Sequence, residues 1–268
     1  MRIRIVFHLW NKGGHVPFHH QYMLSQIIKG INLRGNDERF RNFTDYNFSG
    51  LKGQTQVSRK GLHFFSNKVT LVFSCSNAEF CEYFLDNLFD LEEFEIGTMK
   101  LSPEVVEKEE PYVFSDKMKF VCISPIVIRV PKLDSPEIKS FIDPNEDQFS
   151  DLLYDSTMTR MEELGISGKE IESFYKFQVV PDKVYLEKLK TSNKKFARVY
   201  PVYEDKMKHE VRGYTFPFSL YADKLVQEFI FTHGLGVLGD RGFGMLDIAN
   251  SDPVQRIITR KSKSLINA

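Results

Sequence analysis

Residues 2–31 read RIRIVFHLWNKGGHVPFHHQYMLSQIIKGI and contain two kinds of hydrophobic periodicity. Ile3, Ile5, Phe7 and Leu9 fall on alternate positions, which is typical of a β-strand with one buried face. A Gly-Gly turn follows at 13–14, and proline is favoured at the first position of a helix, so we expect a helix from about residue 17. The apolar residues at 24, 27, 28 and 31 would form its buried face.

The same two patterns continue to residue 107. We expect strands at 46–57 and 61–74, then a helix at 77–91 that opens with Asn77, a good capping residue. Residues 93–101 and 104–107 read as one further strand. The order β-α-β-β-α-β is that of a ferredoxin-like unit, the arrangement also found in RRM-like domains.

The second half repeats this theme more loosely. Strand-like segments are 119–130, 174–189, 195–203, 209–219 and 243–249, and helical segments are 145–164 and 220–232. Pro111 and a charged stretch interrupt the pattern at 111–118. We therefore predict an α+β protein of two tandem ferredoxin-like domains, residues 1–115 and 116–268, the second carrying a glycine-rich loop near the C-terminus.

Composition excludes several classes of protein. The 268 residues are 42% hydrophobic and 27% charged, which is typical of a globular protein rather than a disordered one. No apolar run is long enough to span a bilayer and no secretory signal is evident, so we expect a cytoplasmic protein without a membrane partner. Three cysteines without a CxxC pair argue against a disulfide framework and a cysteine-rich zinc site.

The formal net charge of zero hides an uneven distribution of charge. Residues 1–60 contain ten Lys or Arg and three acidic residues, whereas 79–116 contain twelve acidic residues and two lysines. Such sorting can create a basic face that attracts nucleic acid, although the same residues could equally form solvated surface scattered on both sides.

Residues 234–244, GLGVLGDRGFG, include a G-x-G-x-x-G sequence. A dinucleotide-binding fingerprint must follow a strand and open a helix, whereas here a predicted helix precedes the glycines and a short strand follows them. The context therefore argues against a nucleotide cofactor, and we expect none.

The same stretch contains two G-x-G pairs, with Arg241 between them. Glycines let the backbone approach a bulky partner, and successive amides can form an anion-binding concavity to which an arginine adds further donors. A tight, sterically constrained helix-to-strand connection is the alternative. In the first interpretation, Gly234, Gly236, Arg241, Gly242 and Gly244 would contact the phosphates or base edges of a nucleic acid.

A G-x-G-x5-G-x-G loop near the C-terminus, together with the opening strand and the helix of VPFHHQYMLSQIIKGI, resembles the CRISPR-associated repeat-RNA endoribonucleases of the RAMP superfamily. The resemblance implies two ferredoxin-like domains and metal-independent cleavage of precursor CRISPR RNA within its repeat. The ribose 2′-hydroxyl would attack the adjacent phosphate and leave a 2′,3′-cyclic phosphate and a 5′-hydroxyl. The resemblance also implies CRISPR repeat RNA as the partner. It leaves open whether the protein binds other CRISPR effector subunits or forms a homodimer.

The sequence departs from that family's catalytic pattern. Where many members have a tyrosine on the first helix, alignment on VPFHHQY gives Lys29. The usual histidine would fall in 36–45, which contains none, and the usual lysine near Thr44, with Lys52 close by. Either Lys29 and Lys52 stabilise the phosphate while the substrate geometry does the rest, or the protein is a non-cleaving repeat-RNA binding subunit.

The first helix also offers candidate bases. His19, Tyr22 and Lys29 would share its polar face, so His19 and Tyr22 are catalytic candidates, with a solvated helix surface as the alternative. His20 is in line with the apolar face, which favours a buried structural role. His15, His19 and His20 do not form a convincing metal site, because neighbouring side chains on a helix point apart.

Further RNA contacts are expected outside the glycine loop. Lys194, Lys195 and Arg198 lead into a predicted strand and could follow phosphates, or could form a solvated hairpin tip. Arg4, His8 and Trp10 share one face of the first strand, where they could contact bases or be covered by a helix.

Overall fold

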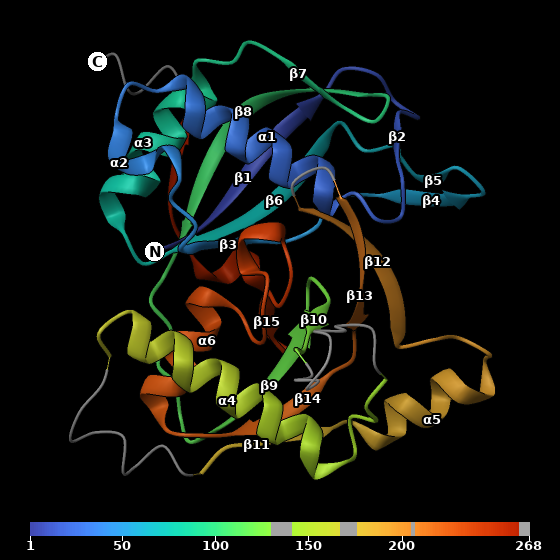
Figure 1. Cartoon of the computed structure of the whole chain (residues 1–268). Coiled ribbons are helices and arrows are strands. Elements are labelled where there is room, and N and C mark those ends of the chain that lie inside the picture. Colours follow the sequence, from blue (N-terminus) through green and yellow to red (C-terminus); the bar gives the residue numbers. More distant parts are fainter. Residues whose placement is uncertain (130–140, 167–175, 205–206, 263–268) are drawn as a thin grey trace. The chain divides into compact units, whose positions relative to one another are not determined.

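The structure is a computed structural model that describes residues 1–129, 141–166, 176–204 and 207–262 (Figure 1). The chain forms two compact units. The first comprises Met1–Pro111, Asp240–Gly242 and the chain from Asp252 onward, and the second comprises Tyr112–Gly239 and Phe243–Ser251. The expected division into residues 1–115 and 116–268 differs from the observed units in three segments: 112–115 belongs to the second unit, and 240–242 and the chain from Asp252 onward belong to the first.

The first unit is built on an antiparallel sheet. Its strands lie in the order β8-β1-β6-β3, which is the fourth, first, third and second strand of a ferredoxin-like unit. Helices α1 (Gln21–Arg34) and α3 (Ala78–Phe89) pack together on one face of this sheet (Figure 1). The strands are β1 (Arg2–Leu9), β3 (Tyr46–Phe48), β6 (Lys68–Cys75) and β8 (Met99–Glu109).

Shorter elements are added to this sheet. Strand β16 (Ile257–Ser262) pairs with the outer edge of β8, and β7 (Phe94–Ile96) forms a hairpin with the same strand. A separate three-stranded sheet contains β2 (His15–Val16), β4 (Thr55–Ser58) and β5 (Gly61–Phe64). The short helix α2 (Glu38–Arg41) connects α1 to β3.

The predicted periodicities explain the core of the first unit. Ile3, Ile5, Phe7 and Leu9 are all buried in one cluster with the apolar face of α1. Helix α3 begins at the predicted cap, because the Asn77 side chain accepts a hydrogen bond from the Phe80 amide at 3.0 Å. Burial of these faces against one another fixes the polar face of α1 on the opposite side.

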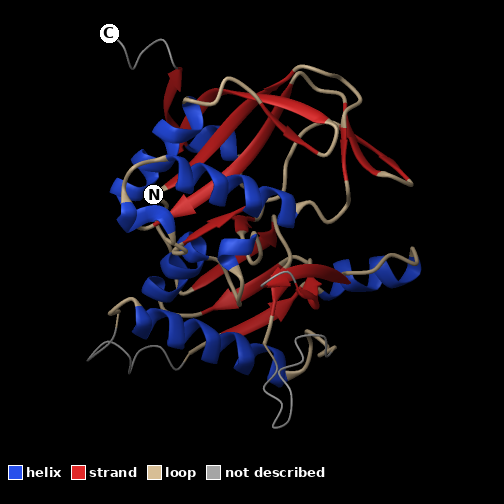
Figure 2. Cartoon of the chain, turned by 45° about the horizontal axis from the view of Figure 1, so that its top comes forward, coloured by secondary structure: helices blue, strands red, loops and turns tan. Residues whose placement is uncertain are grey.

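The second unit repeats the ferredoxin-like order. Its sheet runs β15-β9-β14-β11, again the fourth, first, third and second strand, and α4 (Asp147–Glu163) and α6 (Lys224–His233) are the two helices of the motif (Figure 2). The strands are β9 (Lys117–Cys122), β11 (Gln178–Pro181), β14 (Phe218–Tyr221) and β15 (Leu246–Ile248). The predicted pair of ferredoxin-like folds is therefore confirmed.

An insertion separates the second and third strands of this unit. It contains α5 (Lys183–Thr191) and a long hairpin, β12 (Ala197–Glu204) and β13 (Met207–Tyr214). The hairpin forms its own sheet with β10 (Ile126–Val127). No helix in the described part of the chain is long and apolar enough to cross a membrane.

Several predicted boundaries were wrong. The stretch 174–189 was expected to be a strand, but among its described residues, 176–189, the strand is Gln178–Pro181 and α5 follows. Helix α1 begins at Gln21 rather than near 17, because His15–Val16 pairs with β5. The expected strands 46–57 and 61–74 each divide between two different sheets, and 93–107 contains the β7-β8 hairpin rather than one strand.

His20 precedes α1 and has the structural role that its position favoured. Its side chain is 3% exposed; Nδ1 lies 3.1 Å from the Pro17 carbonyl, and Nε2 accepts a hydrogen bond from the Leu51 amide at 3.0 Å. The neutral Nδ1–H tautomer satisfies both contacts. Burial lowers the pKa of His20 below its usual value, because the charged ring would lose its hydration.

This burial predicts an acid-sensitive fold. The unfolded chain takes up a proton at His20 near its ordinary pKa of about 6.5, whereas the folded chain does so only at lower pH. His20 therefore contributes its full stabilisation above about pH 6.5. As the pH falls from there through the lowered pKa of the folded state, this contribution is lost, by at most about 1.4 kcal/mol per pH unit. Denaturant unfolding between pH 7.5 and 5 should show this slope in the wild type.

His20→Gln is the matched variant, because its side-chain oxygen can accept from Leu51 and does not titrate. Its unfolding free energy should fall less steeply with acid than that of the wild type. Parallel pH profiles for the two proteins would contradict the assignment to His20.

Candidate functional site

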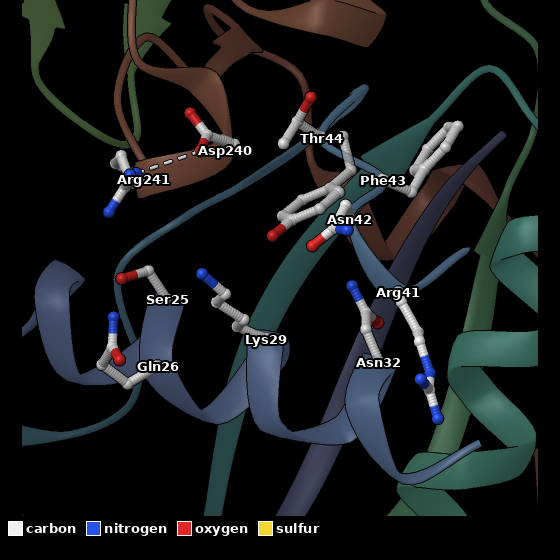
Figure 3. Close-up of a pocket in the computed structure, with 11 residues that line it drawn as sticks. Ser25, Gln26, Lys29, Asn32, Arg41, Asn42, Phe43, Thr44, Asp240 and Arg241 are labelled. Atoms are coloured by element: carbon white, nitrogen blue, oxygen red, sulfur yellow. Dashed lines mark hydrogen bonds and ion pairs between the residues drawn. The ribbon is translucent and has the colours of Figure 1, made fainter. Parts of the chain in front are cut away.

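A pocket of about 200 Å³ lies within the first unit, along the polar face of α1 (Figure 3). It is bounded by the helix, by the segment 41–46 that leads into β3, and by two residues of the glycine-rich stretch. Packing of the apolar face of α1 on the sheet directs the lining residues of the helix away from the core. The lining residues are Ser25, Gln26, Lys29, Asn32, Arg41, Asn42, Phe43, Thr44, Tyr46, Asp240 and Arg241.

The pocket brings together two residues that were singled out in the sequence, Lys29 and Arg241. Lys29 is exposed, and Figure 3 shows its ammonium group extending from α1 toward the Asp240–Arg241 segment. The Arg241 Nε donates a hydrogen bond to the neighbouring Asp240 carboxylate at 3.0 Å. Residues about 210 positions apart in the sequence therefore bound one polar cavity.

Gly242 fixes the position of Arg241. Its φ is +79°, a conformation that favours glycine, and a Cβ at this position would collide with the ring of Phe48 on β3. Absence of a side chain therefore lets this part of the chain lie directly against the sheet. The close approach holds the preceding arginine beside α1.

Cations dominate the charge of this pocket. Lys29, Arg41 and Arg241 line it together with one carboxylate, that of Asp240. Burial raises the pKa of the Tyr46 phenol far above its usual range, and Asp240 raises it further while Arg241 opposes the shift. Tyr46 is therefore protonated at neutral pH and can donate a hydrogen bond, but it is unsuited to act as a base.

In the second unit an arginine organises the beginning of the glycine-rich stretch. Arg160 of α4 donates from Nη1 to the carbonyls of Gly234 (3.0 Å) and Gly236 (2.7 Å), and from Nη2 to that of His233 (2.7 Å). Its guanidinium also lies over the Phe229 ring, 5.3 Å from the centroid. No sequence pattern identified this residue, because its partners are backbone carbonyls and their approach depends on the fold.

The glycines of this unit approach the protein's own backbone closely. A Cβ at Gly236 would collide with the Val127 carbonyl, and one at Gly244 with the Leu235 carbonyl. Several amides of the stretch are engaged internally: Leu235 donates to Gly244, Val237 to Val127, and Gly244 to Pro125. These glycines, buried like Gly234, thus fit the alternative of a sterically constrained connection.

The other predicted catalytic residues do not line the pocket. His19 lies in the turn before α1 and Tyr22 in its first turn, both half-buried. Lys52 pairs through its backbone with Thr70 of β6, with both N···O distances at 2.8 Å. Of the four predicted residues, the structure therefore brings only Lys29 into this cavity.

The remaining predicted RNA contacts lie on other surfaces. Lys194 and Lys195 are exposed after α5, and Arg198 is exposed on β12. Trp10, just after β1, is 63% exposed, whereas the Arg4 side chain on β1 is largely buried and lies 3.5 Å from the Glu107 carboxylate. His8 contacts the Trp10 ring edge-on, with 4.6 Å between centroids. Among the described residues, no three His, Cys, Asp or Glu side chains converge as metal ligands.

Comparison with known proteins identifies several relatives. The family model for the C-terminal part of CRISPR-associated protein Cas6 matches residues 106–248. A Pyrococcus furiosus protein named as a CRISPR-associated endoribonuclease-like Cas6 is 23% identical over 193 residues, which cover 72% of this chain and 73% of that protein.

Two solved structures share the fold. One, of a Cas6-related gene product from Pyrococcus furiosus, has a TM-score of 0.75 at 21% identity and covers 94% of this chain and 99% of its own. The other, a RAMP protein described as binding different RNA substrates, has a TM-score of 0.76 at 19% identity and covers 93% of this chain and 100% of its own.

Proposed function

The chain belongs to the CRISPR-associated Cas6 family, and we propose that it binds the repeat of precursor CRISPR RNA and cleaves it within that repeat. The observation that carries this proposal is the pocket on α1, where Lys29 and Arg241 come together from distant parts of the sequence. Paired cations beside hydroxyl donors suit a phosphodiester, because they stabilise the negative charge that increases on the phosphate as it reacts.

The proposed reaction uses the RNA's own nucleophile. The ribose 2′-oxygen attacks the adjacent phosphorus and gives its proton to a base, the part predicted for His19 or Tyr22; the bond from phosphorus to the 5′-oxygen breaks as that oxygen takes a proton from an acid, so no net proton is consumed. The products are a 2′,3′-cyclic phosphate and a 5′-hydroxyl, and the step needs no metal. Lys29 and Arg241 would hold the phosphate, and the protonated Tyr46 hydroxyl can donate a further hydrogen bond.

A second candidate function is binding of repeat RNA without cleavage. The eleven side chains that line the pocket include no histidine, so none of them has an ordinary pKa near neutrality. His19, Tyr22 and Lys52 remain predicted participants outside that lining. Unless the bound RNA itself holds its 2′-hydroxyl in line for attack on the phosphate, this lining favours weak or absent cleavage.

An experiment with end-labelled RNA separates the two functions. The full chain is incubated in EDTA with the repeat from the CRISPR array of its own genome and with a shuffled RNA of equal length. Cuts at one position of the repeat, with cyclic-phosphate ends, support cleavage; tight binding of intact repeat supports the binding function. Absence of binding to the repeat beyond that to shuffled RNA would overturn both.

Arg241→Ala should weaken binding of the repeat. Loss of a charged hydrogen bond to phosphate or a base edge is expected to cost about 1–3 kcal/mol, or roughly 5- to 150-fold in Kd at fixed salt. Arg39→Ala is the control, because Arg39 is an exposed arginine of the same unit that does not line the pocket. Equal affinities for Arg241→Ala and Arg39→Ala would contradict a role of Arg241 in RNA binding.

A further inference from the structure

One side chain in the pocket carries an unsatisfied polar group. Asn32, in the last turns of α1, is 2% exposed, and its Oδ1 has no hydrogen-bond partner among the residues that the structure describes. Its backbone carbonyl accepts a hydrogen bond from the Tyr83 hydroxyl at 2.6 Å, which anchors this turn of the helix. Burial of an amide oxygen without a donor is unfavourable, so it points to a ligand that supplies one.

The direction of Asn32 places that ligand in the pocket. Figure 3 shows its amide extending from α1 toward Arg41 and Asn42, on the side of Lys29 that faces away from Ser25. The terminal torsion of asparagine is soft, so the amide can present its oxygen and its nitrogen side by side to an occupant. A phosphate cannot satisfy the oxygen, because it offers only acceptors at neutral pH.

The chemistry of an amide edge favours a nucleobase. Asparagine pairs with adenine through two hydrogen bonds, accepting from the exocyclic amine and donating to the adjacent ring nitrogen. Adenine presents this pair on both of its polar edges, since a ring nitrogen flanks the amine on either side. The cavity of about 200 Å³ has room for one base.

We propose that Asn32 selects adenine at a nucleotide next to the phosphate held by Lys29 and Arg241. The inference rests on the proposed binding of repeat RNA at this pocket and adds a base preference to it. Asn32 would be a specificity-determining residue: it contacts the base, while the cations contact the backbone.

The test removes the amine from the RNA and the amide from the protein. After the cut or binding site is mapped, each adenosine flanking it is replaced in turn by purine riboside, which lacks only the amine. Wild type should lose about 5- to 150-fold in cleavage, or in affinity if it only binds, at one of these positions. Asn32→Ala should lose a similar factor with adenosine and nothing more with purine riboside.

Asn42→Ala is the matched control, because Asn42 lines the same pocket but is exposed. This variant should discriminate between the two RNAs as the wild type does. Equal activity of wild type on both RNAs at every flanking position would overturn the proposal, even if Asn32→Ala fails to fold. The proposal would also be overturned if Asn32→Ala still distinguished adenosine from purine riboside. It would be overturned as well if the wild-type preference proved to be for guanosine, for cytidine or, when a deoxynucleotide is tested, for the 2′-hydroxyl.

Failure of the base preference is distinguishable from failure of the proposed function. If the repeat is bound or cut equally well without the adenine amine, the proposed function is supported and the role of Asn32 is contradicted. If wild type neither binds nor cuts the repeat, both fall together.

Discussion

Lys29→Ala is expected to slow cleavage of repeat RNA about a hundredfold while weakening binding by less than about tenfold. The ammonium group faces the part of the pocket that Arg241 also borders, and its charge is most useful when negative charge increases on the phosphate in the transition state. Single-turnover rates with saturating protein, together with Kd values at the same salt, measure the two effects separately.

Two kinds of control sharpen this test. Lys29→Arg keeps the positive charge and should recover part of the rate, whereas Lys29→Met keeps the aliphatic chain and should not. His19→Ala, Tyr22→Phe and Lys52→Ala change predicted residues that lie outside the pocket lining, so we expect smaller losses from each. Equal losses of rate and affinity in Lys29→Ala would make Lys29 a simple contact with the RNA.

The fold was largely predictable because burial produces simple periodicities. The alternation in β1 and the helical spacing at Leu24, Ile28 and Ile31 indicate which face of each element is buried. The residues of both faces lie in one hydrophobic core. Two runs of strand, helix, two strands, helix and strand then leave few possible topologies.

The elements that were missed have little buried apolar surface. Helix α5 has one buried side chain, Leu186, so it contributes little to the core. The available signal was its cap: the Asp182 carboxylate accepts a hydrogen bond from the Tyr185 amide at 3.0 Å. Strand β16 pairs with β8 from the far end of the chain, which no local pattern reveals.

The candidate site was only half predictable. A family resemblance indicates Lys29, and a glycine pattern indicates Arg241. Asn32 and Tyr46 become neighbours of these residues only when α1 packs on the sheet to which β3 belongs. The two G-x-G pairs correctly indicate close approach of the backbone, but Gly236, Gly244 and Gly242 approach the protein's own Val127, Leu235 and Phe48.

Arg160→Ala should give the largest loss of stability. The guanidinium donates three hydrogen bonds to consecutive parts of the chain at His233, Gly234 and Gly236, and water cannot reproduce its planar arrangement of donors. Hydrogen bonds to charged groups are worth more than neutral ones, so we expect a loss of about 3 kcal/mol in the free energy of unfolding of the second unit.

Arg160→Lys separates the charge from the geometry, because an ammonium group on a shorter stem cannot reach all three carbonyls in this arrangement. It should recover little of the lost stability. Hydrogen exchange of the amides in 234–244 should rise in both variants, since the carbonyls on which the loop's conformation depends are released. A variant that unfolds at the wild-type denaturant concentration, with unchanged exchange in this stretch, would show that the glycines and their backbone contacts hold the loop without the arginine. The stretch would then be rigid through steric fit alone, and Arg241 would owe its position only to the contact of Gly242 with Phe48.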